Sequence, residues 1–133
     1  MRTAVDTSIL LDVFLPDPVF GERSRKALTV QHDAGVLIVC DVVWAETRAH
    51  FPSSAVHQRV MNKLGFVYEP IGEAAAAHAG EAWQAYRRAG GKRERLVADF
   101  LIAAFATHQC DALLTRDRGF YKRRFKRLKV IEP

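Results

Sequence analysis

Short runs of apolar residues alternate along the chain with longer stretches in which apolar residues recur every three or four positions. The first run carries the chain through Ala4 and Val5 into Asp6, and a helical repeat begins near Ser8. Four further strands are expected, at Val36–Val39, Phe66–Pro70, Ala112–Thr115 and Leu128–Ile131. Continuous apolar runs of this kind are typical of strands that are buried on both faces of a sheet.

The segments between these runs have the spacing of helices, and several carry helix-ending or helix-starting residues. After the helix near Ser8, which Thr7 or Ser8 is expected to cap, helices are predicted at Val19–Ala34, Asp41–His50, Ser53–Leu64, Ile71–Ala89 and Arg95–His108. A basic turn is expected after Thr115. Strands that alternate with helices predict an α/β fold in which helices cover both faces of a mainly parallel five-stranded sheet. The length of 133 residues predicts one domain over residues 1–133.

Charge adds a candidate surface to this picture. The net charge is +5, and eight of the twenty Lys and Arg residues fall between Arg116 and Lys129. Such a cluster attracts polyanions, although it is also compatible with a solvated face that keeps a small protein in solution. The candidates for contact with a nucleic-acid backbone are Arg116, Arg118, Lys122, Arg123 and Arg124. A second basic group spans residues 92–95.

The chain has no apolar run of the length that a transmembrane helix requires, and its N-terminus lacks the pattern of a signal peptide. These observations predict a cytoplasmic protein. Motifs for dinucleotide binding, NTP binding, serine hydrolysis and zinc proteolysis are also absent from the sequence.

Four acidic residues occupy positions at which an acid is unusual. Asp6 and Asp117 each come just after a predicted strand, where ligands collect in parallel sheets. Glu46 shares a helix face with Val42 and Val43, and Asp99 is the only charge in an otherwise apolar helix. Each acid taken singly has an ordinary alternative, such as a helix cap for Asp6 or an ion pair with an arginine for Asp99.

Taken together, the four acids predict a metal site. Carboxylates that are brought close to one another repel and raise each other's pKa values, unless a cation lies between them. Oxygen ligands without His or Cys favour Mg²⁺ or Mn²⁺. A hard cation beside a basic surface is suited to the hydrolysis of phosphodiesters, because the metal activates a water molecule and offsets charge on the phosphate oxygens.

Four short motifs in this order resemble the PIN-domain family, and among its branches the VapC-type ribonuclease toxins of toxin–antitoxin pairs. The motifs are VDTS at residues 5–8, VWAE at 43–46, ADFLIAA at 98–104 and TRDRGF at 115–120. The resemblance implies a Rossmann-like fold and a Mg²⁺- or Mn²⁺-dependent endoribonuclease that forms a dimer and is inhibited by a small antitoxin. It places Asp6, Glu46, Asp99 and Asp117 in the acidic quartet, with Asp6 and Asp99 as the most direct metal ligands. Ser8 and Thr115 match the supporting hydroxyl positions.

Two other functions remain open from the sequence. One is a phosphatase that uses Asp6 as its nucleophile, although Ser8 stands where such enzymes generally need a second acid. The other is a binding module without catalytic activity, which would bind RNA or protein through the basic residues. The presence of all four acids argues against this second alternative.

Overall fold

Five parallel strands form one sheet at the centre of the molecule. The computed structural model describes residues 1–92 and 97–133. The strands are β1 (Arg2–Val5), β2 (Val36–Cys40), β3 (Phe66–Glu69), β4 (Ala112–Leu114) and β5 (Val130–Ile131). Their spatial order is β3-β2-β1-β4-β5, and every neighbouring pair is parallel. The predicted α/β fold with a five-stranded parallel sheet is therefore confirmed.

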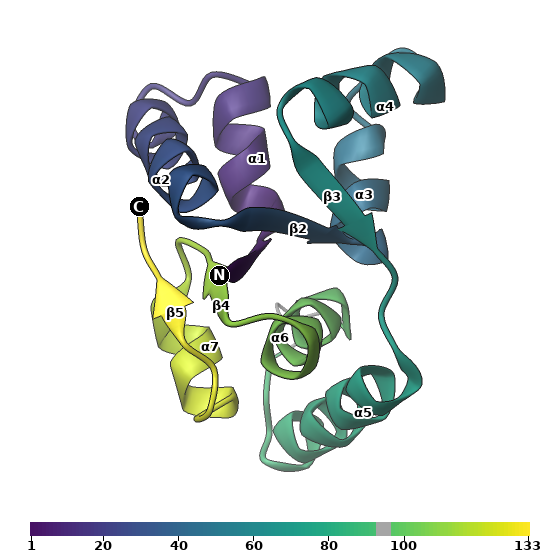
Figure 1. Ribbon diagram of the computed structural model, residues 1–133. Helices are drawn as coiled ribbons and strands as arrows, with labels where there is room; N and C mark the ends of the chain where they lie inside the picture. Colours follow the sequence, from purple (N-terminus) through teal and green to yellow (C-terminus); the bar gives the residue numbers. More distant parts are fainter. Residues whose placement is uncertain (93–96) are drawn as a thin grey trace.

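Seven helices connect the strands in the part of the chain that is described. They are α1 (Thr7–Phe14), α2 (Gly21–Ala34), α3 (Asp41–Arg48), α4 (Ser54–Lys63), α5 (Glu73–Arg88), α6 (Val97–Gln109) and α7 (Arg118–Arg124). The helices α1 and α2 lie on one side of the sheet, and α5, α6 and α7 lie on the other (Figure 1). None of the helices in residues 1–92 and 97–133 is long and apolar enough to cross a membrane.

The core is built from the apolar runs that predicted the strands. Side chains of β1, β2 and β4 are almost entirely buried, as expected for strands covered on both faces. On one side, α6 contributes six buried residues, among them Phe100 and Phe105. Because α6 is apolar nearly all round, it can pack at once against the sheet and against α5.

Two local predictions are wrong. The residue at the N-terminus of α1 is Asp6, and no side chain caps this helix, so neither Thr7 nor Ser8 does so. The expected basic turn after Thr115 contains α7, which buries Phe120 and Tyr121 against the rest of the molecule. The predicted helix start at Arg95 lies outside the described residues.

Candidate active site at the carboxyl ends of β1 and β4

Asp6 follows β1, the strand at which the strand order reverses: β2 and β3 are added on one side of β1, and β4 and β5 on the other. β1 pairs with β2 on one side and with β4 on the other, and the register places Val5 opposite Leu114. The backbone N–H of Asp6 donates a hydrogen bond to the carbonyl of Leu114 (3.0 Å). Asp6 and Thr115 therefore leave the sheet side by side, at the crevice in which parallel α/β folds usually bind their ligands.

Two hydroxyl groups hold the Asp6 carboxylate. Thr115 Oγ1 and Tyr121 OH both donate to Asp6 Oδ2, at 2.7 Å and 3.2 Å. Burial raises the pKa of Asp6 to about 6, and the nearby Asp99 carboxylate adds to this shift, although the two hydroxyl groups and the Thr7 N–H act in the opposite direction. Asp6 is thus a buried acid whose charged form is supported only by neutral donors and is opposed by a neighbouring acid.

Asp99 and Asp117 approach the same place from two other elements. Asp99 lies in the first turn of α6, and Asp117 directly precedes α7. Burial raises the pKa of Tyr121 well above its usual value, and Asp6, Asp99 and Asp117 each add to that increase. The backbone N–H of Asp117 also donates to Thr115 Oγ1 (3.1 Å). Asp6 is therefore in contact with the Tyr121 hydroxyl, and Asp99 and Asp117 are near enough to oppose the ionisation of that hydroxyl.

Glu46 reaches this group of acids through Thr7. The Thr7 hydroxyl donates to Glu46 Oε1 (2.7 Å), and Thr7 follows Asp6 in the chain. The Glu46 side chain is more exposed than its place beside Val42 and Val43 predicts. Ser8, the second predicted hydroxyl, has a buried Oγ that lacks a hydrogen-bond partner within the described part of the chain.

The four carboxylates do not form a closed metal cage in the described part of the chain. Across residues 1–92 and 97–133, no group of three or more His, Cys, Asp or Glu side chains is arranged so that it could hold a metal ion. The links among the four are pairwise: Asp6 with Asp99 through charge, Asp6 with Asp117 through Thr115, and Asp6 with Glu46 through Thr7. The described contacts therefore connect each of the other three acids to Asp6, and they do not define one shared metal-binding centre.

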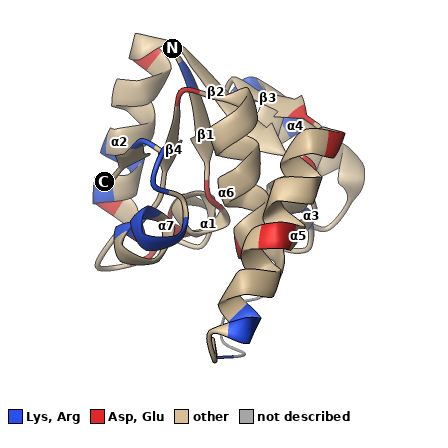
Figure 2. Cartoon of the chain, turned by 90° about the horizontal axis from the view of Figure 1, so that it is seen from below, with Lys and Arg blue, Asp and Glu red and all other residues tan. Residues whose placement is uncertain are grey.

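The five basic residues that were predicted to contact a nucleic acid differ in their contacts within the protein. Arg116 Nη2 pairs with Asp12 Oδ1 (2.9 Å), and its guanidinium lies 4.1 Å from the ring centre of Phe20. Arg118 Nη1 lies 3.5 Å from Glu132 Oε1, and Lys122 Nζ donates to the carbonyl of Leu128 (2.8 Å). Arg123 and Arg124 are exposed on α7, the element over which Lys and Arg gather in Figure 2.

Asp12, on α1, is a buried acid with a structural role. Its side chain is buried, and Ser24 Oγ donates to its Oδ2 (2.6 Å) while Arg116 pairs with its Oδ1. These contacts connect α1 and α2 to the segment between β4 and α7. Because that segment carries Thr115 and Asp117, the ion pair between Asp12 and Arg116 helps to fix the position of these two site residues.

Sequence reasoning missed two residues that touch the carboxylates. Tyr121 is not among the predicted site residues, yet its side chain is buried and its hydroxyl donates to Asp6. Thr7 was considered only as a helix cap, yet it donates to Glu46. The spacing of Tyr121 after Asp117 in a helical register was a usable signal, since Tyr121 N–H donates to the carbonyl of Asp117 (3.4 Å).

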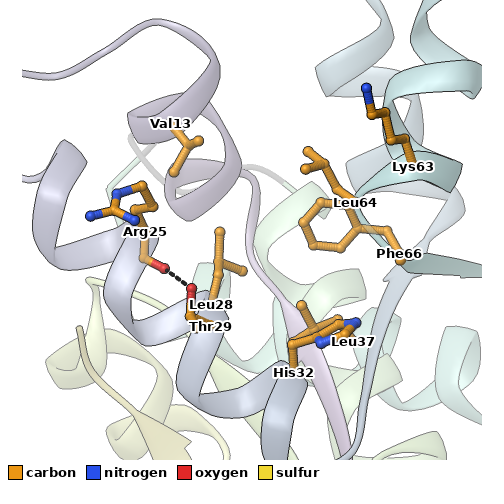
Figure 3. Close-up of a pocket in the computed structure, with 10 residues that line it drawn as sticks. Val13, Arg25, Leu28, Thr29, His32, Leu37, Lys63, Leu64 and Phe66 are labelled. Carbon is orange, nitrogen blue, oxygen red and sulfur yellow. Dashed lines mark hydrogen bonds between the residues drawn. The ribbon is translucent and has the colours of Figure 1, made fainter.

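A separate apolar hollow of about 350 Å³ lies toward the opposite edge of the sheet. Its lining includes Leu37 and Phe66, which lie at the starts of β2 and β3, and residues of α1 and α2. Figure 3 shows Leu28 on one side of this hollow and Leu64 with Phe66 on the other. No acid belongs to the lining that is described, so this hollow is not part of the carboxylate site.

Comparisons with known proteins agree with the fold. The family model of the PIN domain matches residues 3–126. A search of curated protein sequences gave no significant match.

Among solved structures, the fold is similar to VapBC2 from Rickettsia felis bound to a DNA fragment from its promoter, with a TM-score of 0.76 and 16% identity over 100% of this chain and 99% of that one. It is also similar to VapBC-1 from nontypeable Haemophilus influenzae, with a TM-score of 0.68 and 16% identity over 99% and 98% of the two chains. A toxin–antitoxin complex from Klebsiella pneumoniae gives a TM-score of 0.67 and 21% identity over 97% and 95%. At these identities the similarity shows a shared fold.

Proposed function

This chain belongs to the PIN-domain family, and from that premise we propose that it is a cytoplasmic endoribonuclease that hydrolyses RNA phosphodiester bonds with the help of Mg²⁺ or Mn²⁺. The observation that carries the proposal is the Asp6 carboxylate. It is buried at the reversal point of the sheet, its pKa is raised to about 6, and Asp99 and Asp117 lie near it. An acid in these surroundings is stabilised in its charged form when a cation binds beside it.

The donor set fits a hard divalent cation. The acids contribute only oxygen atoms, which are the ligands that Mg²⁺ and Mn²⁺ prefer. Within the described residues, no Lys, Arg or His forms an ion pair with Asp6. A closed cage of three protein ligands is not required, because Mg²⁺ usually keeps several water molecules and binds through one or two carboxylates together with substrate phosphates.

We assign roles to the residues on this basis. Asp6 and Asp99 would hold the ion most directly, and Glu46 and Asp117 would complete the site, directly or through water. When bound, such an ion lowers the pKa of a coordinated water and offsets negative charge on the phosphate oxygens. One carboxylate accepts the proton of the attacking water, and hydrolysis leaves a 3′-hydroxyl and a 5′-phosphate.

The neutral residues around the carboxylates fix their positions. Thr115 and Tyr121 hold one oxygen of Asp6, Oδ2. Thr7 holds Glu46. Ser8 contributes a buried hydroxyl that makes no hydrogen bond within the described chain.

Cleavage of labelled RNA by the purified protein tests the proposal. We expect cleavage with Mg²⁺ or Mn²⁺, loss of cleavage with a chelator, and loss of cleavage in Asp99→Asn with the metal present. Glu22→Gln is a matched control, because Glu22 is an exposed acid on α2 that pairs with Arg25. Cleavage that persists in the chelator would exclude a metal-dependent mechanism. Failure to cleave any RNA tried would favour the binding module without catalytic activity.

We further propose two protein partners, a small antitoxin and a second copy of this chain. The support for the antitoxin is the fold shared with the VapBC proteins and with the toxin–antitoxin complex described above. Copurification with the product of a short neighbouring reading frame, together with suppression of cleavage by that product, tests the first partner. Sedimentation at several protein concentrations tests the second, since a monomer has a mass of 15.0 kDa.

A further inference from the structure

A second hollow, with a volume of about 730 Å³, lies between the end of α5 and α7. Unlike the apolar hollow described above, its lining is mainly polar. Three of its lining residues are cations, namely Lys92, Arg123 and Arg124, and its described lining includes no acid. Figure 2 shows Lys and Arg residues, in blue, on the turns of α7 and at the end of α5. We call this feature the basic hollow.

The cations of the basic hollow are not neutralised by acids in the described part of the chain. Neither Arg123 nor Arg124 forms an ion pair there, in contrast to Arg116 and Arg118. Arg123 Nε donates to the carbonyl of Gly119 (3.1 Å), which fixes the side chain near its own helix. The guanidinium of Arg124 lies 4.8 Å from the ring centre of Tyr86. Both arginines are therefore oriented by neutral groups, and within the described residues no acid neutralises the charge that they could offer to an anionic ligand.

The wall beside these cations is rigid. Tyr86 OH donates to the carbonyl of Lys92 (2.7 Å), which ties the turn after α5 to the helix. A Cβ atom at Gly91 would lie 2.5 Å from the Tyr86 ring, so only glycine permits this close packing. Phe120 packs edge-on against Tyr86, with ring centres 6.4 Å apart. The hollow is thus shaped before any ligand arrives.

The basic hollow borders the carboxylate site through shared helices. Phe120 lines the hollow, and the next residue, Tyr121, donates to Asp6. Phe120 also packs edge-on against Phe100, which follows Asp99 in α6, with ring centres 5.3 Å apart. Contacts between aromatic rings therefore connect the basic hollow to α6, which carries Asp99, and α7 carries both Arg123 and Arg124 and the Tyr121 that donates to Asp6.

We propose that the basic hollow binds a phosphodiester of the RNA strand other than the one that is cleaved, and so holds the strand across the carboxylate site. The identity of the ligand rests on the proposed function. Carboxylates repel an RNA strand, and cations placed beside them, but not paired with them, compensate for this repulsion. Because phosphate contacts carry no base information, the hollow contributes affinity and register and no sequence preference.

Binding of a fluorescent single-stranded RNA of mixed sequence, measured by anisotropy in a chelator, tests the proposal without any need for cleavage. We expect Arg123→Ala with Arg124→Ala to weaken binding about tenfold and to reduce the slope of log affinity against log salt by about one. Ala89→Glu places an acid at an exposed position of the lining and is expected to weaken binding similarly, without removing the contacts of Tyr86. Circular dichroism checks that the variants fold.

The matched control is Lys126→Ala with Arg127→Ala. It removes the same charge from exposed positions near α7 that do not line the hollow, and we expect less than about a threefold effect. Equal losses in the control and in the hollow variants would overturn the proposal, because they would show general attraction only. Tighter binding of polyglutamate than of RNA would also overturn it, in favour of an acidic peptide. Since no metal is present, these outcomes do not depend on whether the protein cleaves RNA.

Discussion

Two buried aspartates, six positions apart at the two ends of the same short helix, have opposite surroundings. Asp6 is 7% exposed and Asp12 is 3% exposed. Asp12 receives a hydrogen bond from Ser24 and an ion pair from Arg116. Asp6 receives hydrogen bonds from the neutral hydroxyls of Thr115 and Tyr121 and lies near another acid.

The comparison shows that burial alone does not identify a functional acid. A buried carboxylate is tolerated when hydrogen bonds and a cation compensate for its lost hydration. In Asp12 the protein supplies that cation, and the residue supports the fold. In Asp6 the supporting groups are neutral, which is the arrangement expected of a group that meets its cation in a bound ligand.

Asp6→Asn is the strongest test of this difference. We expect a loss of RNA cleavage on the order of 10³-fold or more, because a metal contributes several kcal/mol to the stabilisation of the transition state. We expect the free energy of unfolding in a chelator to be unchanged or higher, because the substitution removes a buried charge that lacks a cation. Turnover equal to that of the unaltered protein would show that Asp6 is not part of the site.

The pH dependence of stability is the second test. The pKa of Asp6 is about 6 in the folded protein against a usual value of 3.8, so the folded state holds its proton more tightly. In a chelator, the contribution of Asp6 to stability is therefore complete below about pH 4 and is lost as the pH rises through about 6, a change of about 3 kcal/mol. Chemical denaturation at several pH values measures it.

Several other acids have lowered pKa values and give the opposite slope, among them Asp17 and Glu69. The difference between the unaltered protein and Asp6→Asn isolates the contribution of Asp6. If the two proteins showed the same pH dependence over this range, the surroundings assigned to Asp6 would be wrong.

Asp12→Asn is expected to have the converse effect to Asp6→Asn. It leaves Arg116 without its partner and weakens the bond from Ser24, so we expect the free energy of unfolding to fall by about 2 kcal/mol. Arg116 is 32% exposed at its side chain, which keeps the loss below that of a fully buried pair. Urea denaturation measures the change, and Asp33→Asn, at an exposed position of α2, is the control.

Tyr121→Phe tests the hydroxyl contacts of Asp6 and has the smallest expected effect. The lost hydrogen bond is long, at 3.2 Å, and its removal should lower stability at neutral pH by about 1 kcal/mol. Because the hydroxyl favours the charged form of Asp6, the pKa of Asp6 should rise further. An unchanged midpoint in the pH dependence of stability would contradict the hydrogen bond.

The sequence predicted the sheet and the placement of Asp6 because both depend on local pattern. An apolar run followed by an acid predicts the end of a buried strand from neighbouring residues alone, and β1 ends at Val5 as that pattern indicates. The surroundings of Asp12 could not be predicted from the local sequence, because its partner Arg116 lies 104 positions later in the chain. Helix α7 was also missed, because its helical state depends on the burial of Phe120 and Tyr121 against distant parts of the chain. Whether the four acids bind a metal remains a prediction.

The hydrogen bonds of Asp6 also govern when the site can form during synthesis. Asp6 precedes Thr115 by 109 residues and Tyr121 by 115 residues. A growing chain on the ribosome therefore carries its first acid long before the groups that orient it exist. Until β4 and α7 have been made and have packed beside β1, Asp6 lacks the two hydroxyl groups that orient it, so its native surroundings form only when the chain is nearly complete.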